Sequence, residues 1–405
     1  MAAGAGAPSG TSLKSLLAPI RPQLDAVEHK LRSTEEDEFP LLRLALDRVF
    51  GSGGKRLRPA LAILAAQAGP EPVLERRVVA LGAAMETLHT ASLVHDDLID
   101  NASVRRGLPT LNVWMSPAAT VLAGDYLFAR AAMLITETDN VPVIARFADS
   151  LRRLCDGELR QLLRNAFTTI PGLAQSLGLE LNGHGAAMPG MNGHGTNGAH
   201  AAPGPGDPPT LEEALAILPS DDEYERRITG KTAALFSTAA ETGAMLAGGG
   251  ATQIAGLRDY GLWLGRAFQV VDDVLDFTAS EAELGKPVGS DLRQGHVTLP
   301  VSRFAAGHPE EWRDWVARVP PLLKRTNYVF GPVPEGSGKR SALPAHEAAI
   351  AELIARVAGS EGVPLALQRA AQYARAAQGA LQALPESAAR DLLHGLAEYV
   401  VERSY

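Results

Sequence analysis

Apolar residues recur every three or four positions along most of this chain, a spacing that places them on one face of an α-helix. Ten stretches combine this pattern with many Ala, Leu, Arg and Glu residues, which favour helices. They are residues 11–31, 41–50, 59–68, 73–100, 117–136, 141–166, 231–247, 252–277, 345–358 and 364–383. The alternation of Val, Ile and Thr with polar residues that is typical of strands is nearly absent. The pattern therefore predicts an all-α protein with a single large helical domain.

Two internal segments interrupt the helical pattern. Residues 182–209 are rich in Gly, Pro and Asn and cannot bury enough apolar surface to order themselves, which predicts a flexible linker. Residues 307–344 contain several prolines and predict an irregular insertion at the surface. Candidate functional residues lie on both sides of the first segment. We therefore expect one domain over residues 1–405, with a flexible tail at residues 1–12.

Composition narrows the class of protein. Of the 405 residues, 46% are hydrophobic and 21% are charged, as in a soluble globular protein. The net charge of −8 and the lack of a long Lys/Arg run argue against a general nucleic-acid surface. The single cysteine, Cys155, is expected to be a small buried residue in a reducing compartment. We expect no apolar stretch of membrane-spanning length and no secretory signal, so the predicted location is the cytoplasm.

Two clusters of aspartates share the spacing DDxxD, and each is embedded in apolar sequence. The clusters are Asp96, Asp97 and Asp100, and Asp272, Asp273 and Asp276. One acidic cluster is usually a solvated helix face, but a carboxylate on a buried helix must be paired or must bind a metal. Oxygen-only clusters suit Mg²⁺, which is commonly held by one or two carboxylates together with substrate phosphates. The repeated motif therefore predicts a magnesium site for a phosphorylated ligand.

Basic residues that could bind the phosphates lie near both clusters. Residues 51–59, GSGGKRLRP, combine glycines that allow close backbone approach with the charges of Lys55, Arg56 and Arg58, and Pro59 suits the first turn of a following helix. This is not the P-loop of a nucleotide hydrolase, which needs Ser or Thr directly after the Lys. Four more cations accompany the acidic clusters. They are Arg105, Arg106, Lys231 and Lys286.

Five stretches together resemble the trans-isoprenyl (polyprenyl) diphosphate synthases of the long-chain type. In chain order they are GGKRLRP, LHTASLVHDDLIDNASVRRGLPTLN, GKTAALFSTAAETGAM, GRAFQVVDDVLDF and ELGKPVGSDLRQGHVTLP. The resemblance runs from about residue 40 to the C-terminus, where LHGLAEYVVERSY is similar to the family's ending. It implies the isoprenoid synthase fold, with helices around a central cavity. It also implies an enzyme that condenses isopentenyl diphosphate with an allylic diphosphate to make an all-trans polyprenyl diphosphate.

The resemblance implies a role for each matching residue. Asp96, Asp100 and Asp272 match ligands of three Mg²⁺ ions, with Asp97, Asp273 and Asp276 in supporting positions. Arg105, Lys231 and Lys286 match the allylic diphosphate site, and Lys55, Arg58, His89 and Arg106 match the isopentenyl diphosphate site. Lys231, Thr232 and Gln269 match groups that face the developing allylic cation. One departure is His296, which stands where the family often has a further Lys.

Product length depends on the space beside the first aspartate cluster. Ala91 and Ser92 precede it, and in the family bulky aromatics near these positions block the growing chain. Because both residues are small here, we expect a long-chain product. The alternatives are a short-chain synthase of the same family that makes C15 or C20 products, a class I terpene cyclase, and a regulatory subunit of a heteromeric synthase. The resemblance also implies a homodimer.

Overall fold

The computed structural model describes residues 12–33, 39–51, 53–169, 209–285, 287–319 and 344–403. Within α7 the side chains of residues 160–169 are not described. The predicted linker at 182–209 and the predicted tail at 1–12 lie outside the described residues, except for residues 12 and 209, as does Lys286.

Helices dominate the described part of the chain, as the hydrophobic pattern predicts. The first part contains α1 (Leu13–Leu16), η1 (Ala18–Ile20), α2 (Arg21–Arg32), α3 (Pro40–Gly51), α4 (Leu57–Gln67), α5 (Glu75–Ile99), the strands β1 (Val104–Arg105) and β2 (Leu108–Pro109), η2 (Leu111–Val113), α6 (Pro117–Thr136) and α7 (Val141–Thr169). The second part contains α9 (Leu211–Ala216), α10 (Asp221–Ile228), η3 (Thr229–Ala233), α11 (Ala234–Leu246), α12 (Ala251–Thr278), α13 (Glu281–Leu284), α14 (Ser290–Arg293), α15 (Leu299–Gly307), α16 (Pro309–Arg318), α17 (Pro344–Ala358), α18 (Gly362–Ala380), η5 (Leu381–Ala383) and α19 (Ala388–Glu402). The two strands, each of two residues, pair as an antiparallel hairpin.

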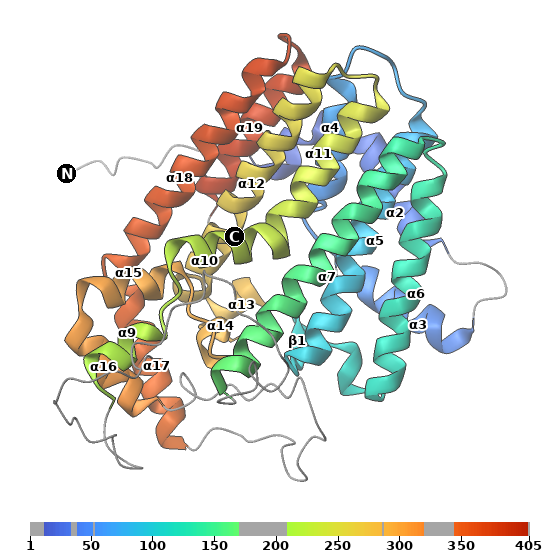
Figure 1. The fold of residues 1–405 in the computed structure, drawn as a ribbon. Coiled ribbons are helices and arrows are strands. Elements are labelled where there is room, and N and C mark those ends of the chain that lie inside the picture. Colours follow the sequence, from blue (N-terminus) through green and yellow to red (C-terminus); the bar gives the residue numbers. More distant parts are fainter. Residues whose placement is uncertain are drawn as a thin grey trace, which may run out of the picture.

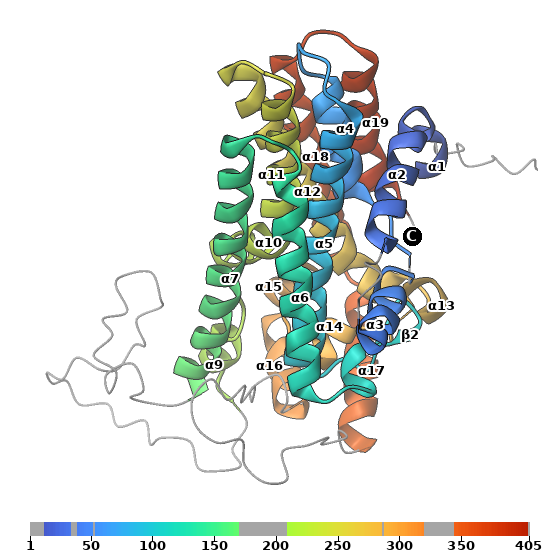
Figure 2. The ribbon, with the colours of Figure 1, turned by 90° about the vertical axis from the view of Figure 1, so that its right-hand side faces the viewer.

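The long helices run side by side in one bundle, with α4, α5, α11 and α12 on its inside (Figure 1). Turning the molecule shows α6 and α7 along one side and α18 and α19 along another (Figure 2). The shorter helices α9, α15, α16 and α17 gather at one end around a second hydrophobic cluster that includes Trp312 and Phe304. The prediction of an all-α, single-domain protein is confirmed.

The predicted irregular insertion at 307–344 is wrong over its first part. Residues 309–318 form α16, in which Trp312 and Trp315 are buried. The two tryptophans lie three positions apart, so they share one face of the helix and dock it onto the second cluster. The prolines of this segment do not interrupt the helix, because Pro309 occupies its first turn and the others come after its last residue, Arg318.

Helices α11 and α12 approach each other closely because glycines of α12 face α11. A Cβ atom at Gly265 would lie 2.5 Å from the Cα of Ala233, and one at Gly261 would lie 2.5 Å from the carbonyl oxygen of Phe236. Any larger residue would push the two helices apart. Gln269 lies one further turn along the same face, where it meets Thr232. Gly261 and Gly265 thus set the distance between the two helices, and the hydrogen bond between Thr232 and Gln269 depends on that distance.

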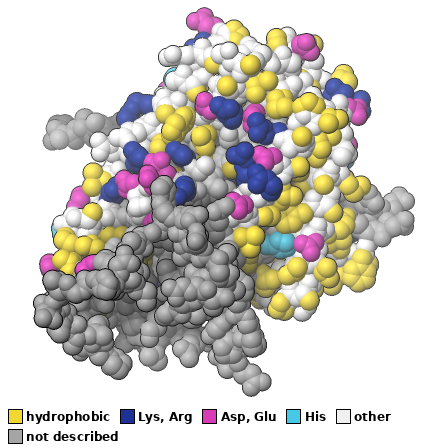
Figure 3. Space-filling view, viewed as in Figure 1, with side chains coloured by type: hydrophobic (Ala, Val, Ile, Leu, Met, Phe, Trp, Pro, Cys, Tyr) yellow, Lys and Arg dark blue, Asp and Glu magenta, His cyan; other side chains and the backbone are white. Residues whose placement is uncertain are grey.

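Helix α6 corrects the expectation that no apolar stretch is long enough to span a membrane. Within the described residues it is the one helix that passes a test of length and composition, and 39% of its most apolar window is buried. It packs along α5, and core helices pass the same test. Its outward residues Val121, Leu122 and Met133 are exposed. Hydrophobic side chains gather on this side of the molecule, where α6 and α7 lie (Figure 3).

Cys155 is exposed, contrary to the prediction that it is buried. It lies on α7 directly after Leu154, which is buried. Consecutive residues point about 100° apart around a helix, so the position after a core residue turns towards the surface.

Candidate active site

The first aspartate cluster lies at the C-terminal end of α5. Asp96 and Asp97 are buried, with 8% and 7% exposure, while Asp100 is half-buried at the C-cap. The body of α5 consists of buried apolar residues, which carry the last turn of the helix inside the bundle. The two carboxylates are therefore withdrawn from water, as the apolar sequence before them predicts, and each needs a partner.

Cations from two other elements supply those partners. Arg105, on β1, donates to Asp97 Oδ1 at 2.8 Å from Nε and at 2.7 Å from Nη2. Lys231 Nζ, on η3, lies 3.2 Å from Asp96 Oδ2. Burial raises the pKa of Asp97, and the Arg105 guanidinium opposes that rise. Both cations were predicted to bind a diphosphate, and the structure places both against the first cluster.

Glu158, on α7, also belongs to this cluster and was missed by the sequence analysis. Its Oε1 lies 3.7 Å from Lys231 Nζ. Burial raises the pKa of Glu158, Lys231 lowers it, and the charge of Asp96 raises it further. Lys231 is thus held between two carboxylates from different helices.

The second aspartate cluster lies on the last turns of α12. Asp273 and Asp276 are buried, with 3% and 0% exposure, while the Asp272 side chain is 39% exposed. Asp276 Oδ2 accepts a hydrogen bond of 3.1 Å from the backbone N–H of Asp291, which ties α12 to α14. The three carboxylates therefore differ in surroundings, although the sequence presents them as one motif.

Arg403 is the partner of Asp272 and was also missed. Its Nη2 donates to Asp272 Oδ1 at 2.5 Å and to the carbonyl oxygen of Phe268 at 3.1 Å. The Arg403 side chain is 1% exposed, and its guanidinium lies 4.1 Å above the centre of the Phe268 ring. The signal that could have revealed it is the C-terminal stretch, which resembles the family's ending.

The loop before α4 brings two further cations to this region. Partial burial lowers the pKa of Lys55 to about 8; the charge of Arg403 lowers it further, and Asp272 raises it. Arg58 is buried in the first turn of α4, and its guanidinium lies 4.7 Å from the centre of the Phe236 ring. Burial lowers the pKa of Arg58 to about 10, which leaves it charged near neutral pH.

Arg56 has a different role from the one predicted. It donates to Glu28 at 2.8 Å, to Glu86 at 2.8 Å and to the carbonyl oxygen of Phe50 at 3.2 Å. These partners lie on α2, α5 and α3, so Arg56 joins three helices from a left-handed backbone position with φ of 47°. Two carboxylates already satisfy its charge, and it holds the loop that carries Lys55 instead of facing a phosphate.

His89 and Arg106 complete the predicted isopentenyl diphosphate set. Arg106 lies in the β1–β2 turn and donates to the carbonyl oxygen of Gly53, which joins this turn to the loop before α4. Partial burial lowers the pKa of His89 well below its usual value, and the charges of Arg58 and Arg106 add to the effect. His89 is thus a neutral imidazole beside two cations. The structure brings these predicted residues together around the start of α4.

A chain of hydrogen bonds links the predicted cation-facing residues to Asp273. The Thr232 hydroxyl donates to Gln269 Oε1 at 2.6 Å, and Gln269 Nε2 donates to Asp273 Oδ1 at 2.9 Å. Tyr224, on α10, donates to Asp273 Oδ2 at 2.7 Å. Burial raises the pKa of Asp273 to about 7, and Asp291 adds to the rise, whereas Arg227 and the two donors oppose it. Tyr224 was not predicted.

The sequence pattern suggested that Lys231 and Thr232 begin a helix, but the structure shows that they do not. They lie in η3, a π-helical turn that joins α10 to α11 without a break. The preceding helix was missed because it is only eight residues long and very polar. π-Helical turns are rare in proteins, and those that occur are often found at functional sites.

The remaining predicted residues differ in burial, and one of them lies outside the described residues. Ala91 is completely buried, whereas Ser92 is half-buried and its hydroxyl donates to the carbonyl oxygen of His89 on its own helix. Of the two, Ala91 is the one turned to the interior. His296 is half-buried, and its backbone N–H donates to the carbonyl oxygen of Asp291. Lys286 lies outside the described residues.

Mg²⁺ prefers oxygen ligands. Both clusters offer carboxylate oxygens, several of them buried. Among the described residues, however, no three acidic or histidine side chains converge closely enough to hold a metal ion by themselves. Mg²⁺ is usually bound through one or two carboxylates plus substrate phosphates. The residues therefore fit an ion that arrives with, and is completed by, a phosphorylated ligand.

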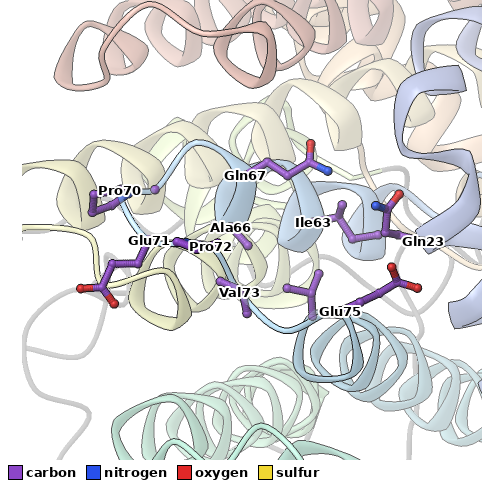
Figure 4. A pocket seen from close by; sticks show the side chains of 11 residues that line it. Gln23, Ile63, Ala66, Gln67, Pro70, Glu71, Pro72, Val73 and Glu75 are labelled. Atoms are coloured by element: carbon purple, nitrogen blue, oxygen red, sulfur yellow. The ribbon is translucent and has the colours of Figure 1, made fainter.

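A surface pocket elsewhere is not part of this arrangement. It is lined by Gln23, Ile63, Gln67, Glu71 and Glu75, among others, around the connection from α4 to α5 (Figure 4). Glu75 begins α5 and Asp96 lies near its end, which separates them by about 30 Å of helix.

Comparison with known proteins shows which family the chain resembles. A family model described as polyprenyl synthetase matches residues 39–174 and 211–319. An octaprenyl diphosphate synthase from Haemophilus influenzae is 31% identical, covering 95% of each chain. A short chain isoprenyl diphosphate synthase from Methanothermobacter thermautotrophicus is also 31% identical, over 95% of this chain and 98% of the relative.

The fold has a counterpart among solved structures. The structure of polyprenyl synthase from Caulobacter crescentus, complexed with calcium and isoprenyl diphosphate, covers 98% of this chain and 100% of its own, with a TM-score of 0.75 and 27% identity. The helical bundle with two aspartate clusters is thus that of a trans-prenyltransferase. The chain belongs to the polyprenyl synthetase family and is a polyprenyl diphosphate synthase enzyme.

Proposed function

We propose that the enzyme condenses isopentenyl diphosphate with an allylic diphosphate, using Mg²⁺, to make an all-trans, long-chain polyprenyl diphosphate. The observation that carries this proposal is the presence of two separate cationic sets beside the two aspartate clusters. Arg105 and Lys231 lie against the first cluster, and Lys55 lies beside Asp272 and Arg403. A transferase that joins two diphosphates needs two such sites, whereas a terpene cyclase needs one.

The first set is the proposed allylic site. Asp96 and Asp100 on α5 and Asp272 on α12 would hold Mg²⁺ together with the diphosphate, and Asp97, Asp273 and Asp276 would support them. When bound, Mg²⁺ neutralises the charge of the leaving diphosphate as a Lewis acid. Arg105, Lys231 and Lys286 are the proposed protein contacts of that diphosphate. The ion pairs of Arg105 and Lys231 with Asp97 and Asp96 place both cations ready at this site.

The second set is the proposed isopentenyl diphosphate site. Arg58 is buried and remains charged, and the turn that carries Arg106 is bonded to the loop that carries Lys55. His89 lies among them as a neutral donor. Fixed donors of this kind lose little freedom when a diphosphate binds.

Lys231, Thr232 and Gln269 are the proposed groups that face the allylic cation. Thr232 and Gln269 are bonded to each other between η3 and α12, close to Lys231. Oxygen dipoles fixed before the reaction stabilise positive charge where it appears. The proton that is lost after the new bond forms can pass to the departed diphosphate, so no protein base is required.

The proposal of a long product is supported by Ala91 and by the octaprenyl relative. Ala91 is completely buried about one and a half turns before Asp96, so a small residue borders the interior there. The short-chain relative is equally identical, which keeps a C15 or C20 synthase as the second candidate.

We also propose a homodimer in the cytoplasm. A second copy would cover the exposed apolar residues of α6, which include Val121, Leu122 and Met133. Exposed apolar surface of this kind commonly marks a protein interface.

One assay tests the proposed reaction. The purified protein is incubated with Mg²⁺, isopentenyl diphosphate and a C15 allylic diphosphate, and released diphosphate and product length are measured. We expect diphosphate release that needs both substrates, stops with a chelator and resumes with added Mg²⁺. Products should extend beyond C20. Release without isopentenyl diphosphate would contradict the condensation, and products that stop at C20 would favour the short-chain candidate.

A further inference from the structure

The hydrogen-bond chain from Tyr224 to Thr232 has a fixed direction. When the Asp273 carboxylate is ionised it only accepts hydrogen bonds, so both of its oxygens receive protons, one from Tyr224 and one from Gln269. The Gln269 amide must then direct its NH₂ group to Asp273 and its oxygen to Thr232. Because that oxygen also only accepts, the Thr232 hydroxyl is the donor of the last bond.

The direction of the last bond decides what Thr232 presents to the cavity. With its proton committed to Gln269, the Thr232 oxygen keeps its lone pairs for another neighbour. Lone pairs stabilise an adjacent positive charge, whereas an O–H directed outwards would repel it. The orientation of one hydroxyl at the reacting centre is therefore set at Asp273, two hydrogen bonds away.

Tyr224 is placed for this purpose by the shape of the backbone. Seven residues make about two turns of an α-helix, and the π-helical η3 accommodates one additional residue. Tyr224 and Thr232, eight positions apart, therefore lie on the same side of the rod formed by α10, η3 and α11. Both contact α12, at Asp273 and Gln269, which are one turn apart.

The neighbouring residue, Glu225, fixes α10 through a second set of partners. Glu225 accepts hydrogen bonds from Tyr373 at 2.6 Å and from Arg266 at 3.3 Å, and it also pairs with Arg369. These partners lie on α18 and α12. Two consecutive residues of α10 thus face different partners, and the buried Tyr224 side chain, 3% exposed, is held in one position.

We propose that Tyr224 and Asp273 are positioning residues: they orient Gln269 and, through it, the Thr232 hydroxyl, so that the lone pairs of the Thr232 oxygen face the allylic cation. This rests on the proposed function of the site. Neither residue needs to touch the substrate. The Tyr224 hydroxyl supports the carboxylate, and the carboxylate fixes the amide.

The decisive variant is Tyr224→Phe, which removes the hydroxyl and keeps the ring. We expect kcat, measured by diphosphate release at saturating substrates, to fall about tenfold, the loss expected for one hydrogen bond to a charged group. KM for isopentenyl diphosphate should stay within about twofold of the wild-type value, because the proposed binding residues of that substrate, such as Lys55 and Arg58, are not part of this chain of hydrogen bonds. Thr232→Val should lower kcat, and Thr232→Ser should retain most of it.

Tyr260→Phe is the matched control. Tyr260 also lies on a buried helix face, is completely buried, and donates a hydrogen bond of 2.6 Å, here to the backbone carbonyl of Leu393. Both variants lose one buried hydrogen bond, so their unfolding midpoints should fall alike, but Tyr260→Phe should keep the wild-type kcat. Equal falls in kcat for the two variants would overturn the proposal, as would an unchanged kcat in Tyr224→Phe.

A double variant separates orientation from other effects. In the Thr232→Val background, Tyr224→Phe should lower kcat by less than about twofold, because the group that it orients is absent. The same factor in both backgrounds would overturn the proposal. If the wild-type protein does not condense the two substrates, the proposed function fails; if it does and Tyr224→Phe remains as active, only the positioning role fails.

Discussion

Arg403 donates a hydrogen bond of 2.5 Å to Asp272, so the C-terminal end of the chain contacts the second aspartate cluster. The charges of both residues also act on Lys55 in the loop before α4. Three regions that are far apart in the sequence thus form one electrostatic unit. A change of charge in any one of these regions should therefore change the electrostatic environment of the other two.

We expect binding of isopentenyl diphosphate to weaken above about pH 8. Lys55, whose pKa is lowered to about 8, is charged below this pH and neutral above it, and only the charged form attracts a diphosphate. Above the midpoint, KM should rise by up to about tenfold per pH unit. Steady-state kinetics between pH 6.5 and 9.5 would measure this. Lys55→Arg stays charged and should show a flat profile; a rise in KM identical to that of wild type would contradict the assignment.

Removing the Arg403 charge should move that midpoint upwards. Arg403→Met keeps a long apolar side chain over the Phe268 ring and deletes the charge that lowers the pKa of Lys55. The Asp272 charge then acts on Lys55 without opposition. The same KM profile, repeated on this variant, should bend at a higher pH. A midpoint that stays in place or falls would show that the two cations do not interact.

We expect Arg56 to contribute mainly to the stability of the fold and not to substrate binding at the active site. Arg56→Ala leaves the Glu86 side chain, which is 4% exposed, without its partner, and we expect a loss of about 3 kcal/mol in the free energy of unfolding. Urea denaturation would measure it. The control is Arg21→Ala, which breaks an equally short pair with Asp25 at an exposed site and should cost less than about 1 kcal/mol. Similar losses for both variants would contradict the interpretation.

Product length should shorten in Ala91→Phe. A phenyl ring at this buried position would project into the interior of the bundle beside the first aspartate cluster and block further growth of the chain. We expect the main product to move towards C15 or C20, as measured by chromatography of the dephosphorylated prenols. Ser92→Ala should leave the product unchanged, because that hydroxyl bonds to its own helix. An unchanged product in Ala91→Phe would place the limit to chain growth elsewhere.

The sequence predicted the long helices well because each repeats its apolar face over many turns. It also predicted that the helices carrying the aspartate clusters would be mostly buried, and Asp96 and Asp273 are buried, whereas Asp272 is partly exposed. Short polar elements such as α10 and the β1–β2 hairpin were missed. A helix of eight residues contains about two turns, which is too short for a periodic pattern to appear.

Pairing between distant residues could not be predicted from spacing. Arg56 looked like a phosphate-binding residue because it stands between Lys55 and Arg58. Its partners Glu28 and Glu86 lie about 30 positions away in either direction, and nothing in the local sequence indicates them. Tyr224 and Arg403 reach the second cluster through the packing of whole helices, so only the assembled fold reveals them.

The π-helical turn η3 also limits how the length of this chain can change. Deleting one residue between Tyr224 and Lys231 would let α10 and α11 join as a regular α-helix, which is the more stable local conformation. Such a protein would keep its hydrophobic core, yet Tyr224 would rotate by about 100° away from Asp273. This segment is therefore a place where a one-residue deletion changes the relative orientation of two functional groups while most of the bundle stays as it is.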